Sequence, residues 1–316
     1  PANLDIYAIA AAAHNSGGKV IFQVRGKVPR HSMKAREVRI PAALVDAVVV
    51  DETQRQGYDL VYDAALSGQD RRDDPQPPQP AFSSRLVIAR RAQQELHDNA
   101  VINFGFGIPD QIAKLIDRDG HAGRYFQTIE HGTYGGRLMD GDLFGYAMNP
   151  SCMIDGPSQF DFYSGGGLDI AFLGFGEIDA AGNVNVSKLG GNTVGPGGFI
   201  DIAQNARKVV FCGTFDTGGT RLETGDGTLR VTSHGRIRKL VEKVDQITFS
   251  GQQASVQGQY VIYVTERAVF ELREDGVHLV EIAPGINLQA DVLDRMAFTP
   301  RVESPLSEMK SGLFQE

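Results

Sequence analysis

Cysteine is scarce in this chain, and metal-binding spacings, long apolar runs and clusters of basic residues are lacking. The two cysteines, Cys152 and Cys212, form no CxxC pair. Cys212 lies in an apolar run typical of a buried strand, and no base is paired with either thiol, so neither is expected to be catalytic. So few cysteines favour a reducing cytoplasm. The seven histidines form no HExxH motif or Cys/His cluster, which argues against a catalytic metal.

The other absences narrow the class of partner. Apolar runs such as residues 42–50 carry a charge and are far too short to span a bilayer. The net charge is −8 and no long Lys/Arg cluster is present, which argues against nucleic acid as a partner. With 316 residues, 41% hydrophobic and 22% charged, the chain is typical of a globular protein of about two domains. We therefore expect neither a nucleic-acid-binding nor a membrane protein.

Residues 1–66 do not resemble a complete domain. The expected elements are a helix over 4–13, a strand over 19–23, an extended piece over 38–40 and a strand over 47–50. The last strand shows no alternation, which predicts burial on both faces as in a parallel sheet. Only one helix accompanies these strands, and the chain starts with Pro1. This stretch is therefore interpreted as the end of a larger α/β unit, in a processed subunit or a fragment.

The proline-rich residues 67–83 predict an extended linker, and regular α/β alternation follows it. Ser83 and Ser84 are expected to cap the first helix, and Gly105-Phe106-Gly107 joins a strand to the next helix. The expected helices cover 86–97, 110–116 and 199–205, and the expected strands cover 101–104, 168–174, 183–187 and 207–213. This alternation predicts an open, doubly wound, mostly parallel sheet.

From about residue 226 the pattern changes to short alternating strands. They are expected over 228–231, 236–241, 246–250, 259–265, 269–272 and 277–282. The turn signal Arg273-Glu-Asp-Gly276 before the last of them indicates a hairpin. We therefore expect an antiparallel C-terminal extension of the same domain, then a short helix over 291–296 and a terminal tail in the last dozen residues.

One segment is central to the interpretation. A short β-prone run, Gln127-Thr-Ile, leads to Glu130, and glycines follow at 132, 135 and 136. A carboxylate at the C-terminal end of a strand lies where α/β sheets bind ligands. Glycine is present at 37 positions, gathered in loops after apolar strands. These loops are either ordinary turns or a surface of backbone N–H groups around a phosphate-bearing ligand, with Glu130 at its centre.

Several motifs together resemble one family. Glu130-His-Gly-Thr-Tyr-Gly-Gly resembles the segment around the catalytic glutamate of class I coenzyme A (CoA) transferases. Further segments match that family in order and spacing: 164–174, 179–187, 195–202, 208–214 and 281–285. The nearest type is the fused acetate/propionate CoA-transferase, with both halves in one polypeptide. The resemblance then makes 1–66 the C-terminal tail of the first half, 67–83 the linker, and 84–316 the second half with the catalytic glutamate.

The resemblance implies a reaction. CoA moves between a short-chain acyl-CoA and a free carboxylate of the acetate, propionate or acetoacetate class, through a covalent thioester on Glu130. Coenzyme A is a substrate, and no permanently bound cofactor or metal is expected. The implied CoA contacts are Gly105, Gly107, Gly165, Gly166, Gly167, Asn183, Gly190 and Gly191. Loops 105–107 and 165–167 are the expected oxyanion donors, and Asn183 and Asn185 are either polar contacts or turn formers.

The resemblance also implies partners. These are the acyl-CoA and carboxylate substrates, the N-terminal half of the enzyme as a separate or missing chain, and further copies in a homo-oligomer. Without the N-terminal half, the chain is expected to be inactive. Two alternatives remain: an acyl-transfer subunit of a lyase or decarboxylase complex, and a non-catalytic sugar-phosphate sensing domain of related fold.

Overall fold

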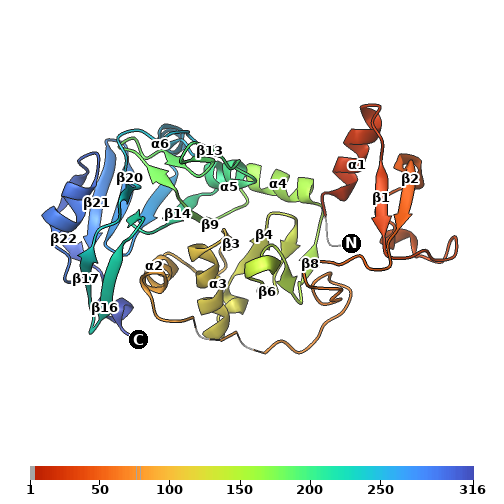
Figure 1. Cartoon of the computed structure of the whole chain (residues 1–316), viewed down its shortest axis with the longest axis horizontal. Helices are drawn as coiled ribbons and strands as arrows, with labels where there is room; N and C mark the ends of the chain where they lie inside the picture. Colours follow the sequence, from red (N-terminus) through yellow and green to blue (C-terminus); the bar gives the residue numbers. More distant parts are fainter. Residues whose placement is uncertain (1–3, 76, 79) are drawn as a thin grey trace. The chain divides into compact units, whose positions relative to one another are not determined.

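The chain forms two compact units, which are described separately. The computed structural model describes residues 4–75, 77–78 and 80–316. Unit 1 comprises Pro1–Asp74 and Ile129–Asp161, and unit 2 comprises Pro75–Thr128 and Phe162–Glu316. Figure 1 shows the helices and strands, coloured along the sequence. Positions 76 and 79 of the expected linker, and positions 1–3, lie outside the described residues. The division of the chain into parts of two transferase halves remains a prediction, because the compact units reflect only which residues pack together.

The N-terminal part of unit 1 contains the predicted helix and strands. Helix α1 (Ile6–Asn15) precedes β1 (Ile21–Val24), which pairs in parallel with β2 (Ala47–Val50). Two 3₁₀ turns, η1 (Ala35–Glu37) and η2 (Ala42–Leu44), connect the strands. The expected burial of β2 on both faces is wrong, because all four residues of β2 are exposed. In the described chain β2 pairs only with β1, and a two-stranded sheet cannot cover both of its faces.

The rest of unit 1 is a set of short strands after Glu130. They are β5 (Thr133–Tyr134), β6 (Arg137–Leu138), β7 (Ala147–Met148) and β8 (Cys152–Met153), with a 3₁₀ turn η4 (Gly141–Leu143) and the start of α4 (Gly156–Ser164). β5 pairs with β8 and β6 with β7, both antiparallel. Ala65, Leu66 and Met148 form a small buried cluster beside these strands. This cluster anchors residues 60–66 to the segment that follows Glu130.

Unit 2 contains the predicted parallel sheet. Its strands follow the order β22-β21-β20-β19-β14-β9-β3-β4. The parallel members are β3 (Val101–Phe104), β4 (Phe126–Ile129), β9 (Ile170–Gly174), β14 (Lys208–Cys212) and β19 (Tyr260–Val264). The helices are α2 (Ser84–Gln93), α3 (Ile108–Arg118), α5 (Phe199–Asn205) and α6 (Gly251–Gln257), with a 3₁₀ turn η3 (Ala122–Arg124). The predicted α/β class is thus confirmed.

The core of unit 2 follows from uninterrupted apolar strands. Residues 170–173 of β9 and 209–212 of β14 are buried, as runs without alternation predict for a sheet covered on both faces. The Phe211 ring packs on Tyr263 and Phe249, with centroids 5.5 Å and 5.1 Å apart. Helix α2 begins as predicted, because the Ser83 Oγ accepts a hydrogen bond from the Leu86 N–H at 3.3 Å.

Smaller strands complete unit 2. They are β10 (Glu177–Ile178), β11 (Val184–Asn185), β12 (Lys188–Leu189), β13 (Asn192–Thr193), β15 (Asp216–Thr217), β16 (Arg221–Gly225), β17 (Thr228–Ser233) and β18 (Ile237–Arg238). The antiparallel extension is confirmed in β20 (Ala268–Arg273) and β21 (Gly276–Ile282), which pair as the hairpin signal predicts.

Three expectations for the C-terminal region are wrong. Residues 246–250 form no strand and make only an isolated bridge at Phe249, while α6 follows directly. The expected helix at 291–296 is a π turn η5 (Leu288–Val292) followed by a 3₁₀ turn η6 (Leu293–Arg295). The last dozen residues are no tail. β22 (Arg301–Glu308) pairs in parallel with β21, and η7 (Ser311–Phe314) buries Phe314 completely.

Candidate functional site

Glu130 directly follows β4, the strand that the sequence predicts. β4 pairs with β3 in parallel register, so the carboxylate follows the C-terminal end of a parallel strand. The side chain is half-buried. Burial raises the pKa of Glu130; the charge of His131 opposes this shift and the carboxylate of Asp5 adds to it. Glu130 is thus a partly desolvated carboxylate, which is less hydrated than one on an open surface.

The glycines after Glu130 hold a chain reversal against the protein's own backbone. Gly132 has φ +104°, and an ideal Cβ there would lie 2.9 Å from the carbonyl carbon of Ile154 and still closer to its oxygen. The Gly132 N–H donates to the Ile129 carbonyl at 2.9 Å, and the Gly132 carbonyl accepts from the Ile154 N–H at 2.8 Å. A side chain at position 132 would therefore displace the turn that presents Glu130.

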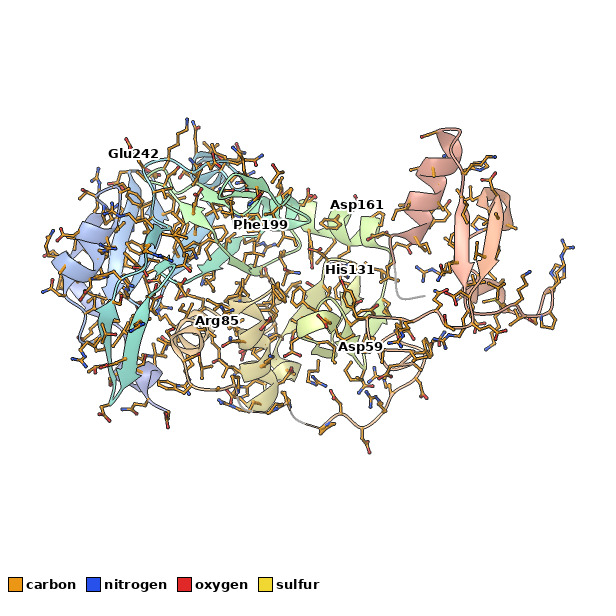
Figure 2. The ribbon with its side chains drawn as sticks, viewed as in Figure 1. Asp59, Arg85, His131, Asp161, Phe199 and Glu242 are labelled. Atoms are coloured by element: carbon orange, nitrogen blue, oxygen red, sulfur yellow. The ribbon has the colours of Figure 1, made fainter. Side chains whose placement is uncertain are left out.

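Two neighbours of Glu130 had no role in the sequence analysis. His131, labelled in Figure 2, is adjacent to Glu130 in the chain. Its ring packs against Gly145, where an ideal Cβ would lie 3.1 Å from the His131 Cε1. Asp5 is far away in sequence, and its carboxylate lies against Gly156, where it leaves no room for a Cβ. Adjacency could have indicated His131, whereas only the folded chain places Asp5 near Glu130.

The glycines of loop 105–107 have hydrogen-bonding roles inside unit 2. The Gly105 N–H donates to the Phe172 carbonyl at 2.8 Å. Gly107, at φ +96°, precedes α3, and its N–H donates to the Asp110 carboxylate at 3.0 Å. Both N–H groups are therefore engaged in this conformation, and oxyanion donation by either would require its present bond to break.

The glycines of loop 165–167 terminate α4. The Gly166 N–H donates to the Tyr163 carbonyl at 2.9 Å, with φ +83°, and the Gly167 N–H donates to the Phe162 carbonyl at 3.0 Å. These bonds satisfy carbonyls at a helix C-terminus, the usual reason for glycine there. Gly165 precedes them in the same loop.

The remaining predicted contacts form turns in unit 2. Asn183 bonds the Asp179 carboxylate through its amide and accepts from the Gly251 N–H at 3.0 Å. Asn185 is fully buried and bonds Glu177 at 2.7 Å. Gly190 and Gly191, at φ +58° and +80°, make the two-residue turn between β12 and β13. The structure thus supports the turn-forming alternative for both asparagines.

The predicted site residues fall in different units. Glu130 belongs to unit 1, whereas the glycine loops and Asn183 belong to unit 2. Their joint action on one CoA therefore stays a prediction. Within the described residues, no group of three or more His, Cys, Asp or Glu side chains is suitable for a metal. Over the same part of the chain, no helix combines the length and apolarity needed to cross a membrane.

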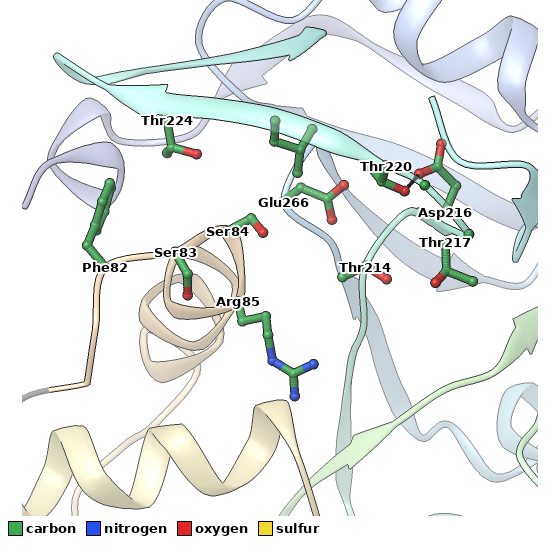
Figure 3. Close-up of a pocket in the computed structure, with 13 residues that line it drawn as sticks. Phe82, Ser83, Ser84, Arg85, Thr214, Asp216, Thr217, Thr220, Thr224 and Glu266 are labelled. Carbon is green, nitrogen blue, oxygen red and sulfur yellow. Dashed lines mark hydrogen bonds between the residues drawn. The ribbon is translucent and has the colours of Figure 1, made fainter. Parts of the chain in front are cut away.

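The sequence analysis missed a cavity in unit 2 and the charged cluster at its wall (Figure 3). Glu266 and Arg267 are both fully buried, and Arg267 lies 2.9 Å from an Asp216 oxygen and 3.2 Å from a Glu266 oxygen. Burial raises the pKa of Glu266, while the Arg267 charge opposes the shift. Buried charges must be paired, so the Thr265-Glu266-Arg267 run after β19 was the available signal.

Known proteins resemble this chain over most of its length, although no family model matches it. The acetate CoA-transferase YdiF of Escherichia coli O157:H7 is 44% identical over 312 residues, which is 98% of this chain and 59% of that protein. The crystal structure of that acyl-CoA transferase as apoenzyme superposes with a TM-score of 0.90 over 99% of this chain. The resemblance to CoA-transferases that the motifs predict is therefore confirmed: the chain is similar to proteins of that name over nearly its whole length.

Another relative and a second solved structure are also transferases of this kind. The caffeate CoA-transferase of Acetobacterium woodii is 43% identical over 317 residues and is covered to 60%. The E. coli YdiF structure described as a thioester complex with CoA gives a TM-score of 0.89 over 98% of this chain and 58% of that one. The chain thus spans about three fifths of the length of these relatives. The decarboxylase AibA/AibB, 22% identical with a TM-score of 0.56, shares the fold alone.

Proposed function

We propose that this chain carries the nucleophile of an acyl-CoA:carboxylate CoA-transferase, and that Glu130 is that nucleophile. The observation that carries the proposal is the geometry at Glu130: a half-buried carboxylate directly after a parallel strand, followed by a glycine turn that admits no side chain at Gly132. The match to transferases at 43–44% identity supports it. These relatives favour CoA transfer over the decarboxylase-complex and sugar-phosphate-sensor alternatives.

The first half of the proposed reaction consumes an acyl-CoA. The Glu130 carboxylate attacks the thioester carbonyl, and the C–S bond breaks to give an acyl-glutamyl anhydride and CoA thiolate. The thiolate then attacks the glutamyl carbonyl of the anhydride. The first carboxylate leaves, and a glutamyl-CoA thioester remains on Glu130. No net proton is taken up or released.

The second half reverses these steps with another acid. The incoming carboxylate attacks the glutamyl thioester, forming a new anhydride and releasing thiolate again. Thiolate attack on the new acyl carbonyl gives the second acyl-CoA and regenerates Glu130. Because a carboxylate is a weak nucleophile toward a thioester, the reaction depends on holding Glu130 beside the carbonyl and on excluding water.

Each attack forms an oxyanion, so N–H donors are required near the reacting carbonyl. The glycines at 105, 107 and 165–167 and Asn183, Gly190 and Gly191 remain the proposed CoA contacts from the family resemblance. Since Gly105, Gly107, Gly166 and Gly167 already donate within unit 2, the proposal requires contact through other atoms of their half-buried backbone, or exchange of one such bond on binding.

The substrates and partners are also proposals. Short-chain acyl-CoAs and carboxylates are the proposed substrates, in keeping with the acetate CoA-transferase among the relatives. The N-terminal half is the proposed partner of unit 1, because β1 and β2 form a sheet whose residues are largely exposed, including Val48 and Val49 at 48% and 50%. A homo-oligomer is also proposed. A cytoplasmic location is proposed as well, in keeping with two free cysteines.

The test is to trap the intermediate. The complete enzyme is incubated with acyl-CoA and no acceptor acid, and intact mass is expected to rise by one CoA less one water. Peptide mapping should locate the adduct on 127–137, and borohydride should convert it to an alcohol at Glu130 and abolish activity. Glu130→Gln should form no adduct, because an amide does not attack as a carboxylate does.

Two further variants sharpen the test. Glu130→Asp should lose most activity, since withdrawing the carboxylate by roughly 1 Å disturbs the attack geometry. Glu242→Gln, an exposed residue of unit 2, is the matched control and should form the adduct normally (Figure 2). A folded Glu130→Ala variant that exchanges CoA near the wild-type rate would show that Glu130 is not the nucleophile.

A further inference from the structure

A series of buried hydrogen bonds lies at the end of β4, two residues before Glu130. It joins the side chains of Asn103 on β3, Tyr163 near the end of α4 and Thr128 on β4. Their exposed fractions are 4%, 0% and 3%, so bulk water is largely excluded from these bonds. All three residues belong to unit 2, and the proposed reaction gives none of them a role.

The direction of each hydrogen bond in the series follows from its partners. The Thr128 hydroxyl donates to the Ile102 carbonyl at 2.8 Å, so its oxygen accepts from the Tyr163 hydroxyl, 2.7 Å away. The Tyr163 oxygen in turn accepts from the Asn103 amide at 3.3 Å. The donors therefore all point one way, from the Asn103 amide to the Ile102 carbonyl. In a buried series such bonds polarise one another, so the loss of one weakens the others.

The series lies where the pairing of β4 with β3 ends. The register of these two strands has Asn103 opposite Thr128 as its last pair. The Asn103 amide also donates to the Thr128 carbonyl at 3.4 Å. After Thr128, the chain has one more residue, Ile129, before it reaches Glu130. The direction in which the backbone leaves β3 toward Glu130 therefore depends on how firmly Thr128 is held.

Tyr163 is the member of the series that belongs to neither strand. Its hydroxyl bonds Thr128, while its carbonyl accepts from the Gly166 N–H at 2.9 Å in the loop that ends α4. Phenylalanine at this position would keep the ring and its packing, and would remove the hydroxyl alone. The Thr128 oxygen would then lose its donor, and the end of β4 would lose one of the bonds that hold it.

We propose that Tyr163 is a positioning residue for the nucleophile. Its hydroxyl holds Thr128, and through Thr128 the end of β4, so that the chain presents Glu130 in one orientation. This inference rests on the proposed function, in which Glu130 attacks a thioester carbonyl. Because such an attack requires a near-attack geometry, a displacement of the carboxylate by less than about 1 Å should already slow it. Tyr163 itself makes and breaks no covalent bond in the reaction.

The test compares variants of the complete enzyme. Tyr163→Phe should lower kcat and the rate of adduct formation on Glu130 by about tenfold, less than the ~100-fold expected of a full 1 Å displacement. The KM for acyl-CoA should stay within about twofold, because the loss arises after binding.

Variants of Thr128 test the same series at its next bond. Thr128→Val removes the hydroxyl and should slow adduct formation as Tyr163→Phe does, whereas Thr128→Ser keeps the hydroxyl and should retain most of the rate. The double variant of Tyr163→Phe and Thr128→Val should be little slower than either single variant, because both changes break one series of bonds.

Val277→Ala is the control for a general loss of stability. Val277 is buried on β21, near the opposite end of the unit 2 sheet from β4. Removing its two methyl groups should lower the melting temperature by a few degrees and leave kcat near the wild-type value. Melting temperatures of all variants show whether the lost rate follows lost stability.

The outcomes distinguish the inference from the proposed function. The inference is supported if Tyr163→Phe and Thr128→Val slow adduct formation at saturating acyl-CoA while Val277→Ala does not. It is overturned if Tyr163→Phe forms the adduct at the wild-type rate, if Thr128→Ser is as slow as Thr128→Val, or if Val277→Ala loses as much rate. A wild-type enzyme that forms no adduct on Glu130 would contradict the proposed function, and the inference with it.

Discussion

Replacing Gly132 by alanine tests how the motif after Glu130 works. Gly132 has φ +104°, outside the small left-handed region that other residues tolerate, so alanine adds backbone strain of about 1–3 kcal/mol. The new Cβ would lie 2.9 Å from the Ile154 carbonyl carbon, whereas carbon atoms prefer about 3.5–4.0 Å. Relief of this contact requires a shift of roughly 0.6–1 Å in the turn next to Glu130.

That shift should affect catalysis more than folding. A misplacement of about 1 Å can cost ~100-fold in rate when a reaction depends on a near-attack geometry. We therefore expect Gly132→Ala to lower kcat by about 100-fold, with a fall in melting temperature of several degrees from the strain alone. Steady-state CoA exchange, the rate of adduct formation on Glu130 and thermal unfolding measure these effects.

Gly141→Ala is the matched control in the same unit. Gly141 also has a positive φ, +56°, but an added Cβ there meets no atom within 4 Å. Its replacement should cost about 1–2 kcal/mol of stability and leave kcat near wild type. The reasoning is refuted if Gly132→Ala exchanges CoA at the wild-type rate, or if Gly141→Ala loses as much activity as Gly132→Ala.

Two further predictions concern ionisable groups. Because Glu130 must be ionised to attack, and burial raises its pKa, kcat/KM should fall as pH drops through a value above the ordinary glutamate pKa. Asp5→Asn removes a nearby negative charge and should move this acidic limb to lower pH; a pH–rate profile with an unmoved limb would contradict the interaction. Cys152 is exposed, and burial raises the pKa of the Cys212 thiol, so replacing Cys152 by Ser and Cys212 by Ala should leave kcat within about tenfold. Loss of activity in a folded double variant would make one thiol essential.

The order of elements around the parallel sheet was readable from the sequence. β3, β2 and α5 have the predicted bounds, because uninterrupted apolar runs and helix-capping residues act over a few neighbouring positions. The C-terminal end was misread for the same reason. β22 has no local apolar signal, and it becomes a strand only because β21 offers it hydrogen-bonding groups.

Local sequence likewise predicted one part of the candidate site and could not predict the other. Local sequence was enough to indicate Glu130, because a strand end followed by glycines is a property of about ten consecutive residues. Gly132 and Gly107 have the positive φ that glycine adopts more readily than other residues. It could not show that the N–H groups of Gly105 and Gly107 already donate to Phe172 and Asp110, because that depends on which groups packing brings together.

By itself, then, the sequence determined the α/β class, the resemblance to CoA-transferases and the carboxylate at the end of β4, since these depend on patterns short enough to be independent of the rest of the chain. Only the tertiary structure placed Asp5 near Glu130, and only it gathered Arg85, Thr220 and Glu266 around one cavity. Those residues lie far apart in sequence and carry no shared motif. Their proximity arises from the packing of α2, β16 and the chain after β19, where the buried charges are stable only because Arg267 pairs with them.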